Sequence, residues 1–428
     1  MSSRQCSLPR RTDERIQRGV IVDTGYDPTP FRDQLIAELT EAGVLRSPIV
    51  ARAFAQVDRA QFVPEVDPEQ AYSTGVVTVR RDGTGRGVSS MSSPIVHAAM
   101  LEVAEPAPGV RVLEVGSGGC NAALLAACVG DSGSVTTTDV DPEIIARVVR
   151  LFPFAQFPTV RAELWDAWES VGRADGEFDL IVVTVECPTL PDSLLASLAP
   201  GGRIVAPVTI HGVRKCIVLD RLADGLRGRV EFDCGFVAAR GHGAGEYDTR
   251  AVRETGEHTL VLRETGVPAP SEKELLSSGT ILSAEDSGIS LAVDRSPSDL
   301  WLWMFSEIAP MASWASLGSR RLDGFTGVSP LGTPVLSDRD GFAFLGWPGP
   351  VREQVDRIDV PVRGGGATGP DLARRLAEAA ASWLEAGEPG RPECLLVPRD
   401  EPSPIDGPTT FRSSLGATAD LVVKRAEG

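Results

Sequence analysis

The sequence has 428 residues, with 59 acidic against 42 basic side chains and a formal net charge of −17. This length exceeds the usual size of one domain, so two domains are expected, and the acidic balance argues against a nucleic-acid partner because phosphate contacts need clustered Lys and Arg. No run of about 18 uncharged apolar residues occurs, so we expect no membrane association and a cytoplasmic location.

Cysteine usage points to the same compartment. Seven cysteines occur without paired CxxC spacing, at positions 6, 120, 128, 187, 216, 234 and 394. Several lie in apolar runs, which favours buried free thiols in a reducing cytosol over a disulfide framework. We predict no metal site from this pattern.

The chain opens with residues 1–30, which carry little periodicity and are expected to form a flexible leader. Apolar periodicity then predicts helices at Phe31–Ala42, Ser47–Val57 and Ile95–Val103, and a short strand at Gly75–Val79. The charged, glycine-rich stretch Arg80–Gly87 is expected to be a loop. The serine-rich run Val88–Pro94 that follows precedes the third helix.

Strand and helix patterns alternate from Val110 onward. Strands are predicted at Ser134–Asp139, Val160–Leu164, Phe178–Val185 and Arg203–Val208, helices at Pro142–Leu151 and Pro191–Leu198, and a closing antiparallel pair at Lys215–Leu219 and Val230–Val237. This alternation predicts an α/β fold with a doubly wound sheet, whose ligand lies beyond the carboxyl ends of the strands. We place this domain at residues 31–238.

A second domain of α+β type is expected over residues 239–428, after the turn Gly241–Gly245. Candidate strands are His258–Leu262, Ile289–Val293 and Gly341–Leu345, candidate helices are Pro297–Ala309 and Asp371–Ala386, and Glu401–Ser414 is compositionally loose. The run from Leu300 to Phe305 is most simply a buried helix core, with a peptide-binding groove as the alternative.

The stretch Val110–Val129 carries the first functional signal. An apolar β-branched run ends in Gly116, Gly118 and Gly119, and an alanine- and leucine-rich helical segment follows. Glycines at such a bend let the backbone approach a ligand closely and permit positive φ. The spacing lacks the last glycine of the dinucleotide fingerprint, and glycines also serve to turn an ordinary strand–helix junction.

Three acidic residues occupy positions that a methyl-donor site would need. Asp139 ends the second strand and can accept hydrogen bonds from both ribose hydroxyls, while Asp166 follows the third strand and could accept from an adenine amino group. Glu114 lies just before the glycine bend and could hold the loop or the donor's ammonium group. Each one taken singly is also compatible with a solvated surface position.

Seven segments of the sequence, in the order in which they occur along the chain, resemble segments of the protein-L-isoaspartate O-methyltransferases. The resemblance covers about residues 31 to 237. The segments are Phe62-Val63-Pro64, Ala71-Tyr72, Met91-Ser92-Ser93-Pro94, Val112-Leu113-Glu114-Val115-Gly116-Ser117-Gly118, Asp139-Val140-Asp141-Pro142, Phe178-Asp179-Leu180-Ile181-Val182-Val183-Thr184 and Leu198-Ala199-Pro200-Gly201-Gly202-Arg203. The glycine loop, acidic strand end and Pro-Gly-Gly occur in most class I methyltransferases. Phe-Val-Pro, Ala-Tyr and the Ser-x-Pro segment are more specific to this family.

The resemblance implies a Rossmann-like class I methyltransferase that uses S-adenosyl-L-methionine, releases S-adenosyl-L-homocysteine and methylates a peptide carboxylate. The family's acceptor-site serine maps onto Ser92, with Ser90, Met91 and Ser93 beside it as substrate contacts. The implied cofactor contacts are Glu114, Gly116, Ser117, Gly118, Asp139, Val140, Asp166 and Val183. An N-cap of the helix from Ile95 is the alternative role for Ser92.

Because a carboxylate is already ionised at neutral pH, the reaction needs no strong base, and in-line positioning with exclusion of water suffices. His97 is therefore expected to be a satisfied helical histidine, and Cys120 a small residue at a turn. Cys120 and Asn121 nevertheless depart from the family pattern, in which a glycine and an aromatic residue are usual. Trp165 before Asp166 is a departure too, because a Gly-Asp-Gly sequence is usual at this position in the family.

The C-terminal half is the largest departure. Extended chains of this kind resemble methyltransferases that accompany ribosomally made modified peptides (lanthipeptides, lasso peptides or graspetides), in which an aspartate ester collapses to an aspartimide. The sequence thus leaves open a peptide-modifying carboxyl methyltransferase, a general isoaspartyl-repair enzyme, a methyltransferase for hydroxyl or amine acceptors, and a non-catalytic cofactor-binding recruitment protein. The expected partner is a peptide or protein bearing Asp or isoAsp, with the enzyme a monomer or weak dimer.

Overall fold

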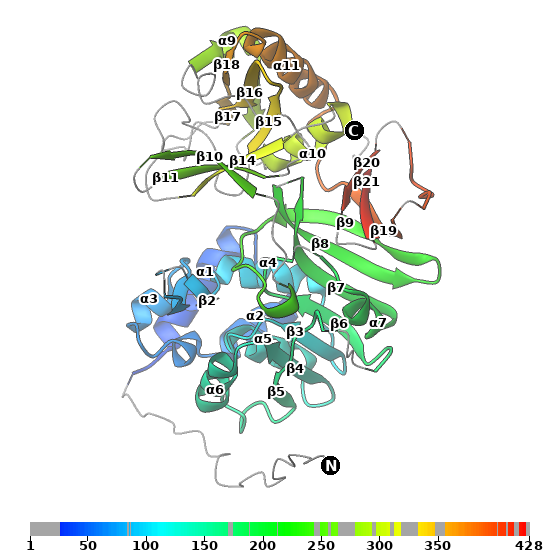
Figure 1. Ribbon diagram of the computed structural model, residues 1–428. Coiled ribbons are helices and arrows are strands. Elements are labelled where there is room, and N and C mark those ends of the chain that lie inside the picture. The colour runs from blue at the N-terminus through cyan, green and yellow to red at the C-terminus, as the bar shows by residue number, and fades with distance from the viewer. Residues whose placement is uncertain are drawn as a thin grey trace, which may run out of the picture.

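The structure is a computed structural model (Figure 1). It describes residues 26–83, 85, 87–169, 174–187, 189–211, 213–243, 249–255, 258–263, 279–292, 297–308, 312–317, 333–346, 356–399, 401–407, 410–414 and 419–424. The predicted leader therefore lies almost wholly outside the described residues, as do Cys6 and the end of the Gly241–Gly245 turn.

The N-terminal part consists of short helices and one β-hairpin, which precedes the last helix of this part. Its elements are α1 (Thr29–Glu41), α2 (Pro48–Gln56), the 3₁₀ turn η1 (Arg59–Phe62), α3 (Pro68–Tyr72), the antiparallel strands β1 (Val77–Arg81) and β2 (Gly87–Met91), and α4 (Pro94–Ala104). Proline stands within the first two positions of α2, α3 and α4, where its missing N–H costs no hydrogen bond.

A ten-stranded mixed sheet forms the body of the molecule. Strands β3 (Arg111–Val115), β4 (Ser134–Asp139), β5 (Val160–Leu164), β6 (Phe178–Val183) and β7 (Leu198–Ile210) are parallel, in the order β5-β4-β3-β6-β7. Helices α5 (Cys120–Val129), α6 (Pro142–Leu151) and α7 (Asp192–Ala196) make the crossovers. The predicted doubly wound order is confirmed, and it places the ends of β3 and β4 side by side.

Antiparallel strands then extend the sheet on the far side of β7. They are β8 (Val213–Leu222), β9 (Gly225–Asp233), β19 (Glu393–Pro398), β21 (Ala419–Lys424) and β20 (Thr410–Ser414), in that spatial order. The last three come from the end of the chain. The domain boundary proposed at residue 238 separates β9 from β19 along the chain. The ten-stranded sheet nevertheless contains strands from both sides of this boundary.

A second, seven-stranded antiparallel sheet forms the other body in Figure 1. It contains β10 (Thr249–Thr255), β11 (His258–Arg263), β14 (Ala312–Leu317), β15 (Thr333–Ser337), β16 (Gly341–Leu345), β18 (Val362–Gly366) and β12 (Gly279–Leu282), and β13 (Ser290–Ala292) pairs separately with β17 (Arg357–Asp359). Helices α9 (Ala284–Ser287), α10 (Pro297–Glu307) and α11 (Gly369–Glu385) complete this body, and α11 packs on β16 and β18.

Side-chain alternation along β6 explains how both faces of the large sheet are covered. Leu180 and Val182 enter the core shared with α2, α4 and α5, whereas Ile181 and Val183 enter a second core that continues into α10 and α11. Every residue from Leu300 to Phe305 is buried there. The interpretation of that run as a helix core is confirmed.

Two stretches for which the sequence pattern predicted no regular structure contain strands. The serine-rich run before α4 is strand β2 for most of its length, because Met91 and Ser90 pair with β1. The compositionally loose stretch Glu401–Ser414 ends in β20, which pairs with β21. In both cases the partner strand, and not the local pattern, supplies the extended conformation.

The six described cysteines are all buried and free, as the sequence predicts. Among the described residues, we find no helix with the length and apolarity needed to span a bilayer.

Candidate functional site

A cavity opens at the carboxyl ends of β3, β4 and β6. Nine of the twelve predicted site residues line it, namely Ser90, Met91, Ser92, Glu114, Gly116, Ser117, Gly118, Asp139 and Val140. A second, more open hollow shares Val140 and Trp165 with it and contains Asp166. Val183 lies in the core, while its neighbours Thr184 and Val185 line the first cavity.

The glycine bend is shaped by Gly116, whose φ is +92°. A Cβ at this position would lie 2.7 Å from Thr184 Oγ1 and 2.8 Å from Val185 Cγ1, so no other residue fits without movement. Its amide donates to the Thr138 carbonyl at 2.8 Å, and its own carbonyl accepts from the Thr184 hydroxyl at 2.6 Å. The bend therefore presents backbone, and not side chains, to the cavity.

Asp139 lies at the end of β4 beside this bend. Its carboxylate accepts from the amides of Ser117 at 3.2 Å and Asp141 at 2.9 Å. Burial raises its pKa above the ordinary value, against the effect of these two hydrogen bonds. Arg240, which follows β9, approaches to 3.6 Å and also bonds Asp141 at 2.8 Å. The carboxylate thus sits in the cavity wall with a cation at its edge.

Glu114 is fully buried beneath the bend. Its oxygens accept from Asn121 Nδ2 at 2.8 Å and from the Thr137 hydroxyl at 2.5 Å, and that hydroxyl lies 2.7 Å from the hydroxyl of Ser117. Burial raises the pKa of Glu114 to about 7. Glu114 was predicted either to hold the glycine loop or to bind the donor's ammonium group. Its contacts favour the first role, because they join β3, β4 and α5 beneath the loop.

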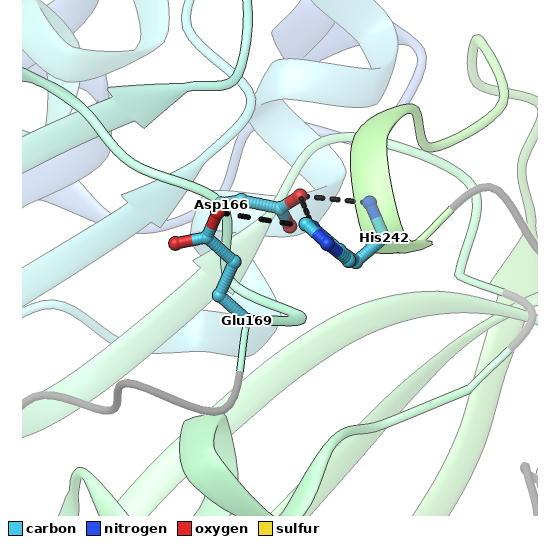
Figure 2. A group of neighbouring side chains, drawn as sticks. All are labelled: Asp166, Glu169 and His242. Carbon is cyan, nitrogen blue, oxygen red and sulfur yellow. Dashed lines mark hydrogen bonds and ion pairs between the residues drawn. The ribbon is translucent and has the colours of Figure 1, made fainter.

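Asp166 is contacted by His242, which lies in the segment that follows β9 in the chain (Figure 2). Its Oδ2 accepts from the backbone amide of His242 at 2.8 Å and lies 3.0 Å from His242 Nδ1, while Oδ1 accepts from the Trp168 amide at 2.9 Å. Glu169 stands 3.8 Å from the same imidazole nitrogen. The adenine-binding position predicted from the sequence is therefore adjacent to the short 3₁₀ turn Gly241–Gly243, which belongs to the turn predicted between the two domains.

The predicted acceptor residues divide into two groups. Ser93 is the N-cap of α4: its hydroxyl accepts from Ile95 N at 3.2 Å and donates to the Thr74 carbonyl at 2.7 Å. The alternative N-cap role suggested for Ser92 is thus wrong, because Ser93 performs it. The Ser92 hydroxyl has no hydrogen bond within the described part of the chain and lines the cavity.

A buried cluster behind Ser92 was missed by the sequence analysis. Arg59 Nη2 donates to the Ser92 carbonyl at 2.5 Å, its Nη1 lies 3.2 Å from His97 Nδ1, and its Nε donates to the Ala71 carbonyl at 2.7 Å. Cys120 lies 3.9 Å from Nη1, and burial raises the pKa of its thiol to about 11, so it is no nucleophile at neutral pH. His97 is buried in α4, as predicted.

The match to a family model decides the relationship to known proteins. The model of protein-L-isoaspartate (D-aspartate) O-methyltransferase matches residues 31–243. The enzyme of that name from Methanopyrus kandleri is 34% identical over 216 residues, which are 48% of this chain and 89% of the relative. The chain belongs to the protein-L-isoaspartate O-methyltransferase family. This membership confirms the predicted methyltransferase fold and enzyme class, with S-adenosyl-L-methionine as methyl donor.

Other members of the family cover a similar part of the chain. The relative from Hyperthermus butylicus is 32% identical over 51% of this chain and 92% of its own length. A solved protein-L-isoaspartate O-methyltransferase aligns with 85% of this chain and 96% of its own, at a TM-score of 0.45 and 18% identity. A Plasmodium falciparum homologue solved with S-adenosyl-L-homocysteine gives a TM-score of 0.42 over 49% of this chain at 19% identity.

Proposed function

We propose that this enzyme methylates a side-chain or isoaspartyl carboxylate of a peptide or protein, with Ser92 at the acceptor site. The observation that carries the proposal is that one cavity is lined both by the glycine bend with Asp139 and by Ser90, Met91 and Ser92. A methyl donor and its acceptor must meet within one water-poor space for in-line transfer. This cavity has the residues for both.

The residues fit an adenosine-containing donor. Asp139 offers carboxylate oxygens for ribose hydroxyls, and the Gly116–Gly118 backbone can pass close to a ligand because no Cβ intervenes at Gly116. We propose Glu114, Ser117, Val140, Asp166 and Val183 as further contributors, Glu114 through the loop it holds. When bound, the donor supplies an electrophilic methyl group on a sulfonium.

The protein's own contribution to the reaction is orientation. The Ser92 hydroxyl is free to donate to the incoming carboxylate, and Ser90 and Met91 extend the same wall of the cavity, whereas Ser93 supports the wall from behind through its cap. An ionised carboxylate needs no proton removed, so no general base is required. The carboxylate of an Asp side chain and the free α-carboxylate of an isoaspartyl residue satisfy this requirement, but neutral hydroxyls do not.

Methyl transfer to matched isoaspartyl and aspartyl peptides tests the proposal. The product should be base-labile, because esters hydrolyse readily while ethers and N-methyl groups persist. Ser92→Ala should lower kcat/KM for the peptide by about tenfold, the usual effect of one hydrogen bond to a charged group, and leave S-adenosyl-L-homocysteine binding unchanged. Ser132→Ala, at an exposed serine, is the control. A base-stable product, or donor binding without turnover, would contradict the carboxyl assignment.

A modified precursor peptide is a second candidate acceptor. The Methanopyrus kandleri and Hyperthermus butylicus relatives match 48% and 51% of this chain, so about half of the chain lies outside those two alignments and offers additional surface for a particular substrate. In such a peptide, methylation would promote closure to an aspartimide, because methoxide leaves more easily than an ionised carboxylate oxygen. Faster turnover of a cyclised aspartyl peptide than of a linear isoaspartyl peptide would favour this acceptor over general repair.

A further inference from the structure

Arg59 is a buried cation that has no carboxylate partner among the described residues. Its side chain is 3% exposed, and the groups that its guanidinium contacts are two carbonyls, one imidazole and one thiol. The adjacent carboxylate, Asp58, is engaged elsewhere, accepting from Ala60 N and from the Tyr72 hydroxyl, both at 3.0 Å. A charge desolvated in this way is costly unless something else compensates for it.

The contact between Arg59 and His97 fixes the state of the imidazole. A guanidinium is a donor only, so Nδ1 of His97 must accept, and the ring proton of the neutral imidazole then resides on Nε2. Burial and the neighbouring cation hold the pKa of His97 well below its usual value, which keeps the ring neutral. No described residue bonds Nε2, and the imidazole lines the same cavity as Ser90 and Ser92.

We propose that Arg59 and His97 form the recognition pair for the acceptor's carboxylate. His97 donates its Nε2–H to a carboxylate oxygen, and Arg59 is the positioning residue that fixes this tautomer, holds the Ser92 backbone and supplies positive charge behind both. This proposal rests on the proposed function, because it places the acceptor beside Ser92. It also explains why the site would select a carboxylate as the methyl acceptor.

The geometry favours an anion over other acceptors. A hydroxyl or amine must lose a proton on methylation and would need a base in contact with it, whereas Nε2 of His97 already carries a proton. A carboxylate gains a hydrogen bond from that donor and the attraction of a weakly screened cation. The pair therefore favours ionised acceptors and leaves donor binding to the glycine bend and Asp139.

Two substitutions at His97, made in the full-length chain, separate its donor role from packing. His97→Gln retains an amide N–H near the Nε2 position, and His97→Leu retains bulk without a donor. His97→Leu should lower kcat/KM for an isoaspartyl peptide by about 10- to 100-fold, through the peptide's KM, and His97→Gln by about threefold or less. Unchanged S-adenosyl-L-homocysteine affinity and unfolding midpoint show that each variant is folded.

Peptide binding gives a measure that does not depend on turnover. Anisotropy of a labelled isoaspartyl peptide on protein saturated with S-adenosyl-L-homocysteine should show the same loss for His97→Leu. If the wild-type enzyme methylates no peptide, the proposed function fails. Equal peptide affinity of wild type and His97→Leu overturns the recognition pair, whether or not the wild-type enzyme turns over.

The positioning role of Arg59 has a spectroscopic signature. In ¹⁵N spectra of the wild-type protein, the His97 signal, assigned by its absence from His97→Gln, should be that of the neutral Nε2–H tautomer from pH 6 to 8. Arg59→Met should shift the tautomer signal and weaken peptide binding, and Arg59→Lys should recover part of both. An Nδ1–H tautomer in the wild-type protein would overturn the proposal.

Discussion

Nη2 of Arg240 lies 3.6 Å from Oδ1 of Asp139, and both residues line the cavity beside the glycine bend. The contact is longer than a hydrogen bond, and the Arg240 side chain is 34% exposed, so water screens much of the attraction. Asp139 is thus held mainly by the amides of Ser117 and Asp141 and keeps acceptor capacity for a ligand.

Asp139→Asn should weaken S-adenosyl-L-homocysteine binding by about 10- to 100-fold, because a charged acceptor of ribose hydroxyls is lost. Arg240→Gln, which removes only the screened cation, should change the Kd by less than about threefold. Isothermal titration calorimetry with S-adenosyl-L-homocysteine gives the Kd of both variants and checks both predictions. Similar Kd values for Asp139→Asn and the wild type would remove Asp139 from the donor site.

Gly116→Ala should abolish measurable donor binding and destabilise the protein. The new Cβ meets both Thr184 and Val185 at under 3 Å, in addition to the strain of a left-handed backbone. Gly43→Ala is the matched control, because Gly43 also has positive φ, +68°, but open space around it. The control should lose only about 1 to 2 kcal/mol of unfolding free energy. Equal losses for both, measured by chemical denaturation, would show that close approach at Gly116 is unimportant.

Glu114 makes folding stability depend on pH. Its pKa rises from 4.5 to about 7 on folding, so the folded state binds the proton more tightly. The stabilising contribution is present below about pH 4.5 and is lost as the pH rises towards 7. At about 1.4 kcal/mol per pKa unit, Glu114→Gln should be more stable than the wild type by a few kcal/mol at pH 8 and similar at pH 4.5.

Denaturation curves at the two pH values check this, with the exposed Glu41→Gln as control. Glutamine can accept from Asn121 and donate to Thr137, so the loop contacts persist. Unchanged donor affinity in Glu114→Gln supports the loop role, and a large loss would instead assign Glu114 to the donor's ammonium group. A pH-independent difference in stability would contradict the raised pKa.

The sequence was sufficient where function depends on local pattern. The strand–glycine–helix order around Gly116 and the carboxylate that ends β4 are encoded within a few residues of each other, and the parallel order of the sheet then brings them together. Ser92 was found through its motif, although which serine caps α4 depends on backbone geometry that the Ser-Ser-Pro run leaves undecided.

The parts that were missed depend on contacts between distant residues. Arg59 precedes a proline-terminated turn, and no local feature shows that its guanidinium reaches residues 33 and 38 positions later. His242 belongs to a glycine-rich turn whose contact with Asp166 spans 76 positions. Likewise, β19 pairs with β9 although the second body lies between them in the chain. Periodicity identifies such a strand but carries no information on its partner.

Lys215 links the two halves of the chain within a buried ion-pair group. Its fully buried Nζ lies 3.0 Å from Asp233 Oδ1, at the end of β9, and 3.1 Å from Asp299 Oδ1, on α10. Lys215→Met leaves both carboxylates without their cation and should cost about 3 to 5 kcal/mol of unfolding free energy. Arg374→Met, which breaks the exposed pair with Asp371, should cost less than about 1 kcal/mol.

A double-mutant cycle with Asp299→Asn tests whether the ion pair of Lys215 with Asp299 joins α10 to the ten-stranded sheet. Once Lys215 is absent, neutralising Asp299 removes an unpaired buried charge, so the double variant should be more stable than Lys215→Met alone. Urea denaturation followed by tryptophan fluorescence, which reports on Trp165 and Trp168 in the first half and on tryptophans such as Trp301 and Trp303 in the second, and by circular dichroism should give coincident transitions if both halves unfold together. Additive effects of the two substitutions, with separate transitions, would mean that the halves of the chain are stabilised independently.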